Sequence, residues 1–235
     1  GSLTFLNEEL NVKRFKIPSG EIFSIDLLEY IRRFDKPIIL STGMANLKEI
    51  KETINFLNSN QKKDITVLHC ISNYPAPIKH VNMRFMKTIQ EDCGVKVGFS
   101  DHTLGNLSSI TAVAMGAKII EKHVTLDKSL PGPDHKASAT IPEFEDLVKQ
   151  IRDVEIIKGN YSKKFTEEER KIHKVARKSV VSRKKLEIGQ IILREDICFK
   201  RPGTGVSPLD LDLILGKKVK NNIAADKVIH LKDLQ

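Results

Sequence analysis

Two histidines, His102 and His123, end two short apolar runs, 95–102 and 117–123, that are typical of buried strands. Imidazole nitrogens are common ligands of divalent metals, so two of them at the ends of neighbouring strands are able to share one cation. In parallel α/β folds, the carboxyl ends of the strands carry the chemistry. The pair therefore predicts a metal site. Hydrogen-bonded structural histidines are the alternative.

Polar loops follow five β-prone runs and could together hold a phosphate. Hydroxyl groups, glycines that let backbone amides approach and the ammonium of Lys16, between Phe15 and Ile17, are suited to an anion. An unpaired ammonium inside a strand is costly unless it faces such an anion, although an edge strand with Lys16 in solvent is the alternative. The loops are Ser19-Gly20-Glu21, Ser41-Thr42-Gly43, Ser72-Asn73-Tyr74, Ser100-Asp101-His102 and Glu121-Lys122-His123.

Three further charged residues have both a chemical and a structural interpretation. Glu21 could be a general acid or base, or could begin a helix, where a carboxylate favours the positive end of the dipole. Asp134 lies between proline-stiffened turns that could direct it at a hydroxylated ligand, or it is a turn-forming aspartate. Arg201, on a Gly/Pro loop, could reach an anion or a sugar carbonyl, or be solvated.

The elements that must position these residues repeat a strand–loop–helix pattern typical of parallel βα units. An amphipathic helix at 142–159 follows them, and Asn46 with Glu49 predicts a capping box. We predict a domain of parallel βα units at 1–159, a linker at 160–174 and a small, mostly β domain at 175–235. The predicted strands are 13–19, 36–42, 65–72, 95–102 and 117–123, with helices at 24–34, after Asn46, at 84–92 and at 108–116.

Composition narrows the class of protein. With 235 residues, 40% of them hydrophobic, the chain is long enough for one large domain or for one medium and one small domain. The formal charge of +9 comes from basic residues interleaved with acidic ones, so we expect small anionic substrates and no nucleic acid. Three dispersed cysteines and no long apolar run predict a cytoplasmic protein without disulfides or a membrane segment.

Seven ordered motifs resemble those of the N-acylneuraminate (sialic acid) synthases, including the legionaminic and pseudaminic acid synthases of bacteria. The resemblance implies a TIM (β/α)₈ barrel followed by an antifreeze-like (SAF) domain, and a domain-swapped homodimer that uses Mn²⁺ or Mg²⁺. It also implies condensation of phosphoenolpyruvate with an N-acetylated amino sugar to a nine-carbon 2-keto acid, with release of phosphate. The motifs are KIPSGE, ILSTGM, HCISNYP, GFSDHT, EKHVT, LPGPDHKAS and KRPGTG.

The resemblance also implies a role for each matching residue. His102 and His123 correspond to the metal ligands, and Glu21 to the catalytic carboxylate, with His123 and Tyr74 also at the reacting centre. Asp134, Tyr74 and Arg201 correspond to sugar-contacting residues, the arginine reaching the partner subunit. The phosphoenolpyruvate set comprises Lys16, Ser19, Ser41 and Ser100, together with Ser72 or Asn73 at the carboxylate.

The start of the chain departs from the family pattern. It opens on Gly1-Ser2, and the resemblance implies barrel strands four to eight alone, so we expect a cloned fragment with unpaired sheet edges. A noncatalytic sugar-binding or interaction module is therefore the alternative function. A related phosphoenolpyruvate aldol-type enzyme with another sugar is disfavoured by the C-terminal domain, and the motifs do not identify the sugar.

Overall fold

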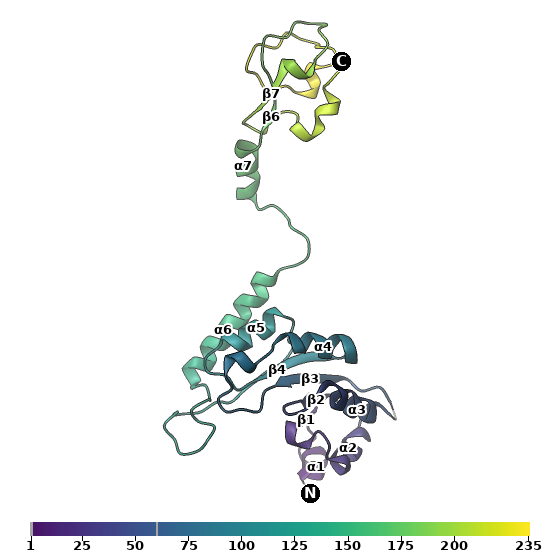
Figure 1. The fold of residues 1–235 in the computed structure, drawn as a ribbon, viewed down its shortest axis with the longest axis vertical. Helices are drawn as coiled ribbons and strands as arrows, with labels where there is room; N and C mark the ends of the chain where they lie inside the picture. The colour runs from purple at the N-terminus through teal and green to yellow at the C-terminus, as the bar shows by residue number, and fades with distance from the viewer. Residues whose placement is uncertain (1, 60) are drawn as a thin grey trace. The chain divides into compact units, whose positions relative to one another are not determined.

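Five parallel strands form one sheet, in the order in which they occur along the chain (Figure 1). The structure, a computed structural model, describes residues 2–59 and 61–235, which divide into units at 1–159 and 160–235. All five strands lie in the first unit and inside the predicted ranges. They are β1 Phe15–Ile17, β2 Ile38–Ser41, β3 Ile65–Cys70, β4 Lys96–Asp101 and β5 Ile120–Lys122.

Alternation along each strand gives the sheet two different faces. Residues such as Phe15, Val67 and Phe99 are buried against the helices in one core. The residues between them, including Lys16 and Ser100, lie on the opposite face, because successive side chains of a strand point to opposite sides. Parallel register aligns the strand ends, pairing Lys16 with Ile39 and Ser100 with Glu121. One face is therefore a hydrophobic core, and the other collects polar side chains.

Helices connect successive strands, as the predicted βα pattern requires. Asn46 caps α3 in the predicted capping box, with its side chain accepting from the Glu49 amide and the Glu49 carboxylate accepting from the Asn46 amide. None of the described helices is long and apolar enough to cross a membrane. The helices and short turns of this unit are α1 Ser2–Thr4, η1 Phe5–Glu9, η2 Ser19–Glu21, α2 Ile25–Arg32, α3 Leu47–Asn58, η3 Ile78–His80, α4 Arg84–Cys93, α5 Leu107–Ala114 and α6 Ile141–Lys158.

These elements fit part of a TIM barrel. Within residues 2–59 and 61–235, β1 and β5 each have a neighbouring strand on one side, as expected for an incomplete barrel. The sheet thus accounts for the parallel α/β part of the predicted fold.

The second unit contains a two-stranded antiparallel sheet, β6 Ser179–Ser182 with β7 Ile197–Lys200. Isolated antiparallel bridges, such as Leu186 with Ile223, extend the β-type pairing around a separate hydrophobic core. The mostly β character expected here therefore arises more from single bridges than from long strands. Short helical turns complete the unit: η4 Arg194–Asp196, η5 Pro208–Leu213 and η6 Leu231–Asp233.

The segment 160–174, predicted as a linker, contains most of helix α7, Glu167–Ala176. Thr166 and Glu169 form a capping box at its start, and its residues are mostly exposed. Helix α7 contains few apolar residues, so the apolar content of the segment does not indicate it. The Thr-x-x-Glu spacing was the signal available for it.

Acid should destabilise the first unit through His69, which packs against Phe85 and Phe99 and donates from Nε2 to the Val81 carbonyl. Burial outweighs that hydrogen bond and lowers the pKa of His69. The contribution of neutral His69 to the free energy of unfolding is therefore complete above the unfolded-state pKa of about 6.5, and it is lost as the pH falls below that value. Below pH 6.5, the unfolding free energy should fall by up to about 1.4 kcal/mol per pH unit for this proton.

Urea unfolding between pH 7.5 and 5 tests this effect. The variant His69→Gln keeps an amide donor near the Nε2 position without titrating, so its stability should depend less on pH. An unchanged slope in that variant would assign the acid sensitivity to other groups.

Candidate functional site

The polar face of the sheet opens into a cavity of about 380 Å³ at the carboxyl ends of the strands. This volume lies in the range of small-ligand sites. All five strands or the loops that follow them contribute to the lining. The lining residues are Lys16, Pro18, Ser19, Gly20, Ser41, Met44, Cys70, Ser72, Tyr74, Ser100, His102, Glu121 and His123.

The two histidine rings meet at one side of this cavity. Their centroids are 5.2 Å apart in an edge-to-face arrangement, and the Tyr74 ring lies 4.1 Å from that of His102. His102 Nδ1 donates to the Ile71 carbonyl at 2.8 Å, which leaves Nε2 unprotonated in the neutral ring. Burial lowers the pKa of His102, favouring that neutral form.

This donor set fits a divalent cation. A metal-binding histidine commonly donates its second ring nitrogen to a carbonyl, which fixes the orientation of the ring, as His102 does with Ile71. Among the described residues, no group of three or more His, Cys, Asp or Glu side chains is arranged to hold a metal. A cation held by the two histidines would therefore need further ligands. Asp134 lies near them, with its carboxylate 3.9 Å from His123 Nδ1.

The Lys16 ammonium, the Glu121 carboxylate and several serine hydroxyls line the rest of the cavity. Lys16 Nζ lies 3.2 Å from Glu121 Oε2, and Ser100 Oγ donates to Glu121 Oε1 at 2.7 Å. Ser41 is 2% exposed, and its hydroxyl has no hydrogen-bond partner among the described residues. A buried polar atom without a partner is costly, so this hydroxyl is available to a ligand.

Most of the predicted site residues lie together, but four do not line the cavity. Glu21 accepts a hydrogen bond from Ser24 instead, and Asn73 is exposed whereas its neighbour Ser72 lines the cavity. Asp134 approaches His123 but is not among the lining residues. Arg201 lies in the second unit, where its Nε donates to the Ala176 carbonyl. The predicted residues that line the cavity are Lys16, Ser19, Ser41, Ser72, Tyr74, Ser100, His102 and His123.

Five lining residues have no predicted role of their own, although Gly20 and Glu121 belong to the predicted polar loops: Pro18, Gly20, Met44, Cys70 and Glu121. The two-residue period of the strands was a signal for the last two. Glu121 lies two positions before His123, and Cys70 lies opposite Ser100 in the β3–β4 register, so both share a face with predicted residues. Met44 follows Gly43 and adopts a positive φ of 65°, which the motif does not indicate.

Replacing Gly43 by alanine should disturb the loop that lines the cavity. Its amide donates to Ser19 Oγ at 2.8 Å, and an added Cβ would lie 2.1 Å from Ser72 Oγ. Overpacking of this kind costs about 1–3 kcal/mol. We expect a lower midpoint of thermal unfolding for Gly43→Ala. The control Gly20→Ala adds a Cβ with nothing within 4 Å, so equal losses in both variants would contradict this explanation.

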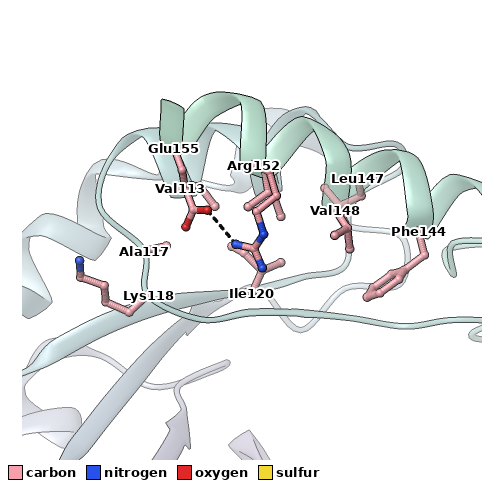
Figure 2. Close-up of a pocket in the computed structure, with 10 residues that line it drawn as sticks. Val113, Ala117, Lys118, Ile120, Phe144, Leu147, Val148, Arg152 and Glu155 are labelled. Atoms are coloured by element: carbon pink, nitrogen blue, oxygen red, sulfur yellow. Dashed lines mark hydrogen bonds and ion pairs between the residues drawn. The ribbon is translucent and has the colours of Figure 1, made fainter. Parts of the chain in front are cut away.

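A second cavity, of about 210 Å³, lies between α6 and the β5 side of the sheet (Figure 2). Figure 2 shows Phe144, Leu147 and Val148 on α6 above Ile120, while Arg152 pairs with Glu155 at 2.8 Å. The predicted apolar face of α6 therefore lines this cavity. Apart from that ion pair and Lys118, its lining is apolar, so it lacks the grouped reactive side chains of the strand-end cavity.

Comparison with known proteins gives a consistent result over both units. Residues 1–163 match the NeuB family, and residues 177–235 match the SAF domain. The chain is 44% identical to an N,N'-diacetyllegionaminic acid synthase of Campylobacter jejuni, over 97% of this chain and 69% of that protein. It is 34% identical to a pseudaminic acid synthase of Helicobacter pylori, over 98% of this chain and 68% of that protein.

Solved structures agree with the sequence comparison. A spore coat polysaccharide biosynthesis protein E from Chromobacterium violaceum superposes with a TM-score of 0.82 at 26% identity, over 98% of this chain and 70% of that one. An N-acetylneuraminic acid synthetase from Leptospira borgpetersenii, in complex with citrate, has a TM-score of 0.64 at 33% identity, over 70% of this chain and 57% of that one.

Proposed function

The chain belongs to the NeuB family, and we propose that it condenses phosphoenolpyruvate with an N-acetylated amino sugar and releases phosphate. The product would be a nine-carbon 2-keto sugar acid. Relatives are named legionaminic and pseudaminic acid synthases, which supports a sugar of the N-acetylmannosamine or 2,4-diacetamido hexose class.

One observation carries the proposal: a metal-type histidine pair and an anion-type cluster line the same cavity. Lys16 supplies positive charge, and the Ser41 hydroxyl, which has no partner in the described part of the chain, could donate to a phosphate oxygen. The histidines stand at the other side, beside the exposed ring of Tyr74. Two substrates, one phosphorylated and one carrying a carbonyl, would therefore meet between them.

The protein's own residues would act mainly by positioning and electrostatics. Lys16, Ser19, Ser41 and Ser100 are proposed to hold the phosphate, and Ser72 or Asn73 the carboxylate. Bound Mn²⁺ or Mg²⁺, held by His102 and His123, would polarise the carbonyl oxygen of the sugar.

The carbon–carbon bond would form between C3 of phosphoenolpyruvate and the sugar carbonyl carbon. Water then adds at C2, and phosphate leaves by cleavage of its C–O bond. A carboxylate must handle the protons of these steps. Glu121 already lines the cavity, whereas Glu21 would first have to leave Ser24.

Asp134 and Tyr74 are proposed to contact the sugar. The family resemblance further suggests a homodimer in which Arg201 reaches the partner's cavity. In such a dimer, the second unit would contribute to sugar binding in the partner subunit.

Phosphate release tests the function, with the C. jejuni relative as a positive control for the assay. We expect release to require phosphoenolpyruvate, an amino sugar and Mn²⁺ or Mg²⁺ together, and mass spectrometry over a sugar panel to identify the product. Release without sugar or metal would contradict the proposal. A noncatalytic sugar-binding module would instead bind sugar without metal-linked affinity for phosphoenolpyruvate, which calorimetric titration measures.

A further inference from the structure

A buried ion pair joins β4 to β5 immediately before the two histidines. Asp101 and Lys122 face each other in the strand register, one residue before His102 and His123 respectively. Lys122 Nζ lies 3.0 Å from Asp101 Oδ2, and the two side chains are 2% and 0% exposed. By alternation, this pair faces the helix side of the sheet while the histidines face the cavity.

The pair belongs to a fully connected hydrogen-bond network. Asp101 Oδ1 accepts from the backbone amide and the hydroxyl of Thr103, each at 2.8 Å. Its Oδ2 accepts from Ser109 Oγ on α5 at 2.6 Å. Lys122 also donates to the Thr103 carbonyl at 2.9 Å. The network therefore connects the end of β4, the start of α5 and the end of β5 through the Asp101 carboxylate and the Lys122 ammonium.

Stability alone is a poor explanation for such a pair. Two charges removed from water lose hydration free energy, which their mutual attraction often does not offset. Proteins with apolar residues in place of such a pair are frequently as stable. The best-attested use of buried ionic groups is to specify one arrangement over alternatives. At this place, the arrangement specified is the relative position of the ends of β4 and β5.

We infer that Asp101 and Lys122 are positioning residues that set the spacing of His102 and His123 for a shared divalent cation. The inference rests on the proposed function for the identity of the ligand. The backbone connects each charged residue directly to a histidine, so a shift of one strand end moves its ring. Groups outside the ligand set that orient ligands commonly affect metal affinity by about 10–100-fold.

The test variant is the double replacement Asp101→Asn with Lys122→Met. It removes both charges together, while the asparagine still accepts from Thr103 and can donate to Ser109. The matched control makes the same chemical changes at Asp92 and Lys51, an ion pair at 2.7 Å between α4 and α3, outside the cavity lining. The milder variant Ser109→Ala removes one donor and leaves both charges in place.

Two measurements on the 235-residue chain separate this inference from the proposed function. Free Mn²⁺, followed by electron paramagnetic resonance, gives the affinity without turnover. Ring ¹H–¹⁵N spectra of the metal-free protein report the surroundings of His102 and His123. We expect about 10–100-fold weaker Mn²⁺ binding and shifted ring signals in the double variant, a smaller change of the same kind in Ser109→Ala, and wild-type behaviour in the control.

Each other outcome counts against a stated claim. Wild-type Mn²⁺ affinity and unchanged ring signals in a folded double variant would overturn the positioning role, as would wild-type values in Ser109→Ala if the double variant does not fold. If the wild-type chain binds no Mn²⁺, the metal part of the proposed function fails. Shifted ring signals then still support control of the histidine geometry, and unchanged signals overturn it.

Discussion

Replacing His123 by alanine is expected to abolish Mn²⁺ binding and, with it, metal-dependent phosphate release. Among the described residues that line the cavity, His102 and His123 are the two histidines, so the loss of His123 leaves a single imidazole nitrogen for the ion. Removal of a ligand should exceed the roughly 10–100-fold effect of groups outside the ligand set. The histidine side chain is 38% exposed, so little packing is lost.

Electron paramagnetic resonance of Mn²⁺ and the phosphate assay measure this result. His80→Ala is the control, because His80 is an exposed histidine of η3 that does not line the cavity. If His123→Ala retained wild-type Mn²⁺ affinity, His123 would not be a ligand.

Replacing Lys16 by methionine should weaken phosphoenolpyruvate binding by about 10–100-fold. The variant keeps the length of the side chain but removes the ammonium, and a hydrogen bond to a charged group is worth about 1.5–3 kcal/mol. In the wild type, Lys16 lies 3.2 Å from the Glu121 carboxylate. Without the ammonium, that carboxylate would lack its partner and would repel an anionic ligand. Both effects weaken the binding of the phosphate group of phosphoenolpyruvate.

Calorimetric titration with phosphoenolpyruvate gives the affinity directly. Lys16→Arg should retain more affinity than the methionine variant because it keeps the charge. Lys51→Met, which breaks the ion pair with Asp92 outside the cavity lining, should bind as the wild type does. Equal affinity in Lys16→Met and the wild type would exclude Lys16 from the anion site.

Two assignments within the cavity depend on contacts that the motifs do not contain. Glu21 stands in the KIPSGE motif, yet its carboxylate accepts from Ser24, and the carboxylate in the cavity is Glu121. Both are acidic residues near a strand end, so sequence position alone does not distinguish them. The direction of each side chain decides which carboxylate lies in the cavity. The turn after β1 sets the direction of Glu21, and the alternation along β5 sets that of Glu121.

The sequence by itself determined the five strands, the helices between them, the capping box at Asn46 and the strand-end position of both histidines. These features depend on local periodicity and on hydrogen bonds between residues three or four positions apart. Only the tertiary structure decided that Lys16 meets Glu121 and that Asp101 meets Lys122 behind the histidines. Those pairs join separate strands, and their contact depends on register and sheet curvature, which long-range packing sets.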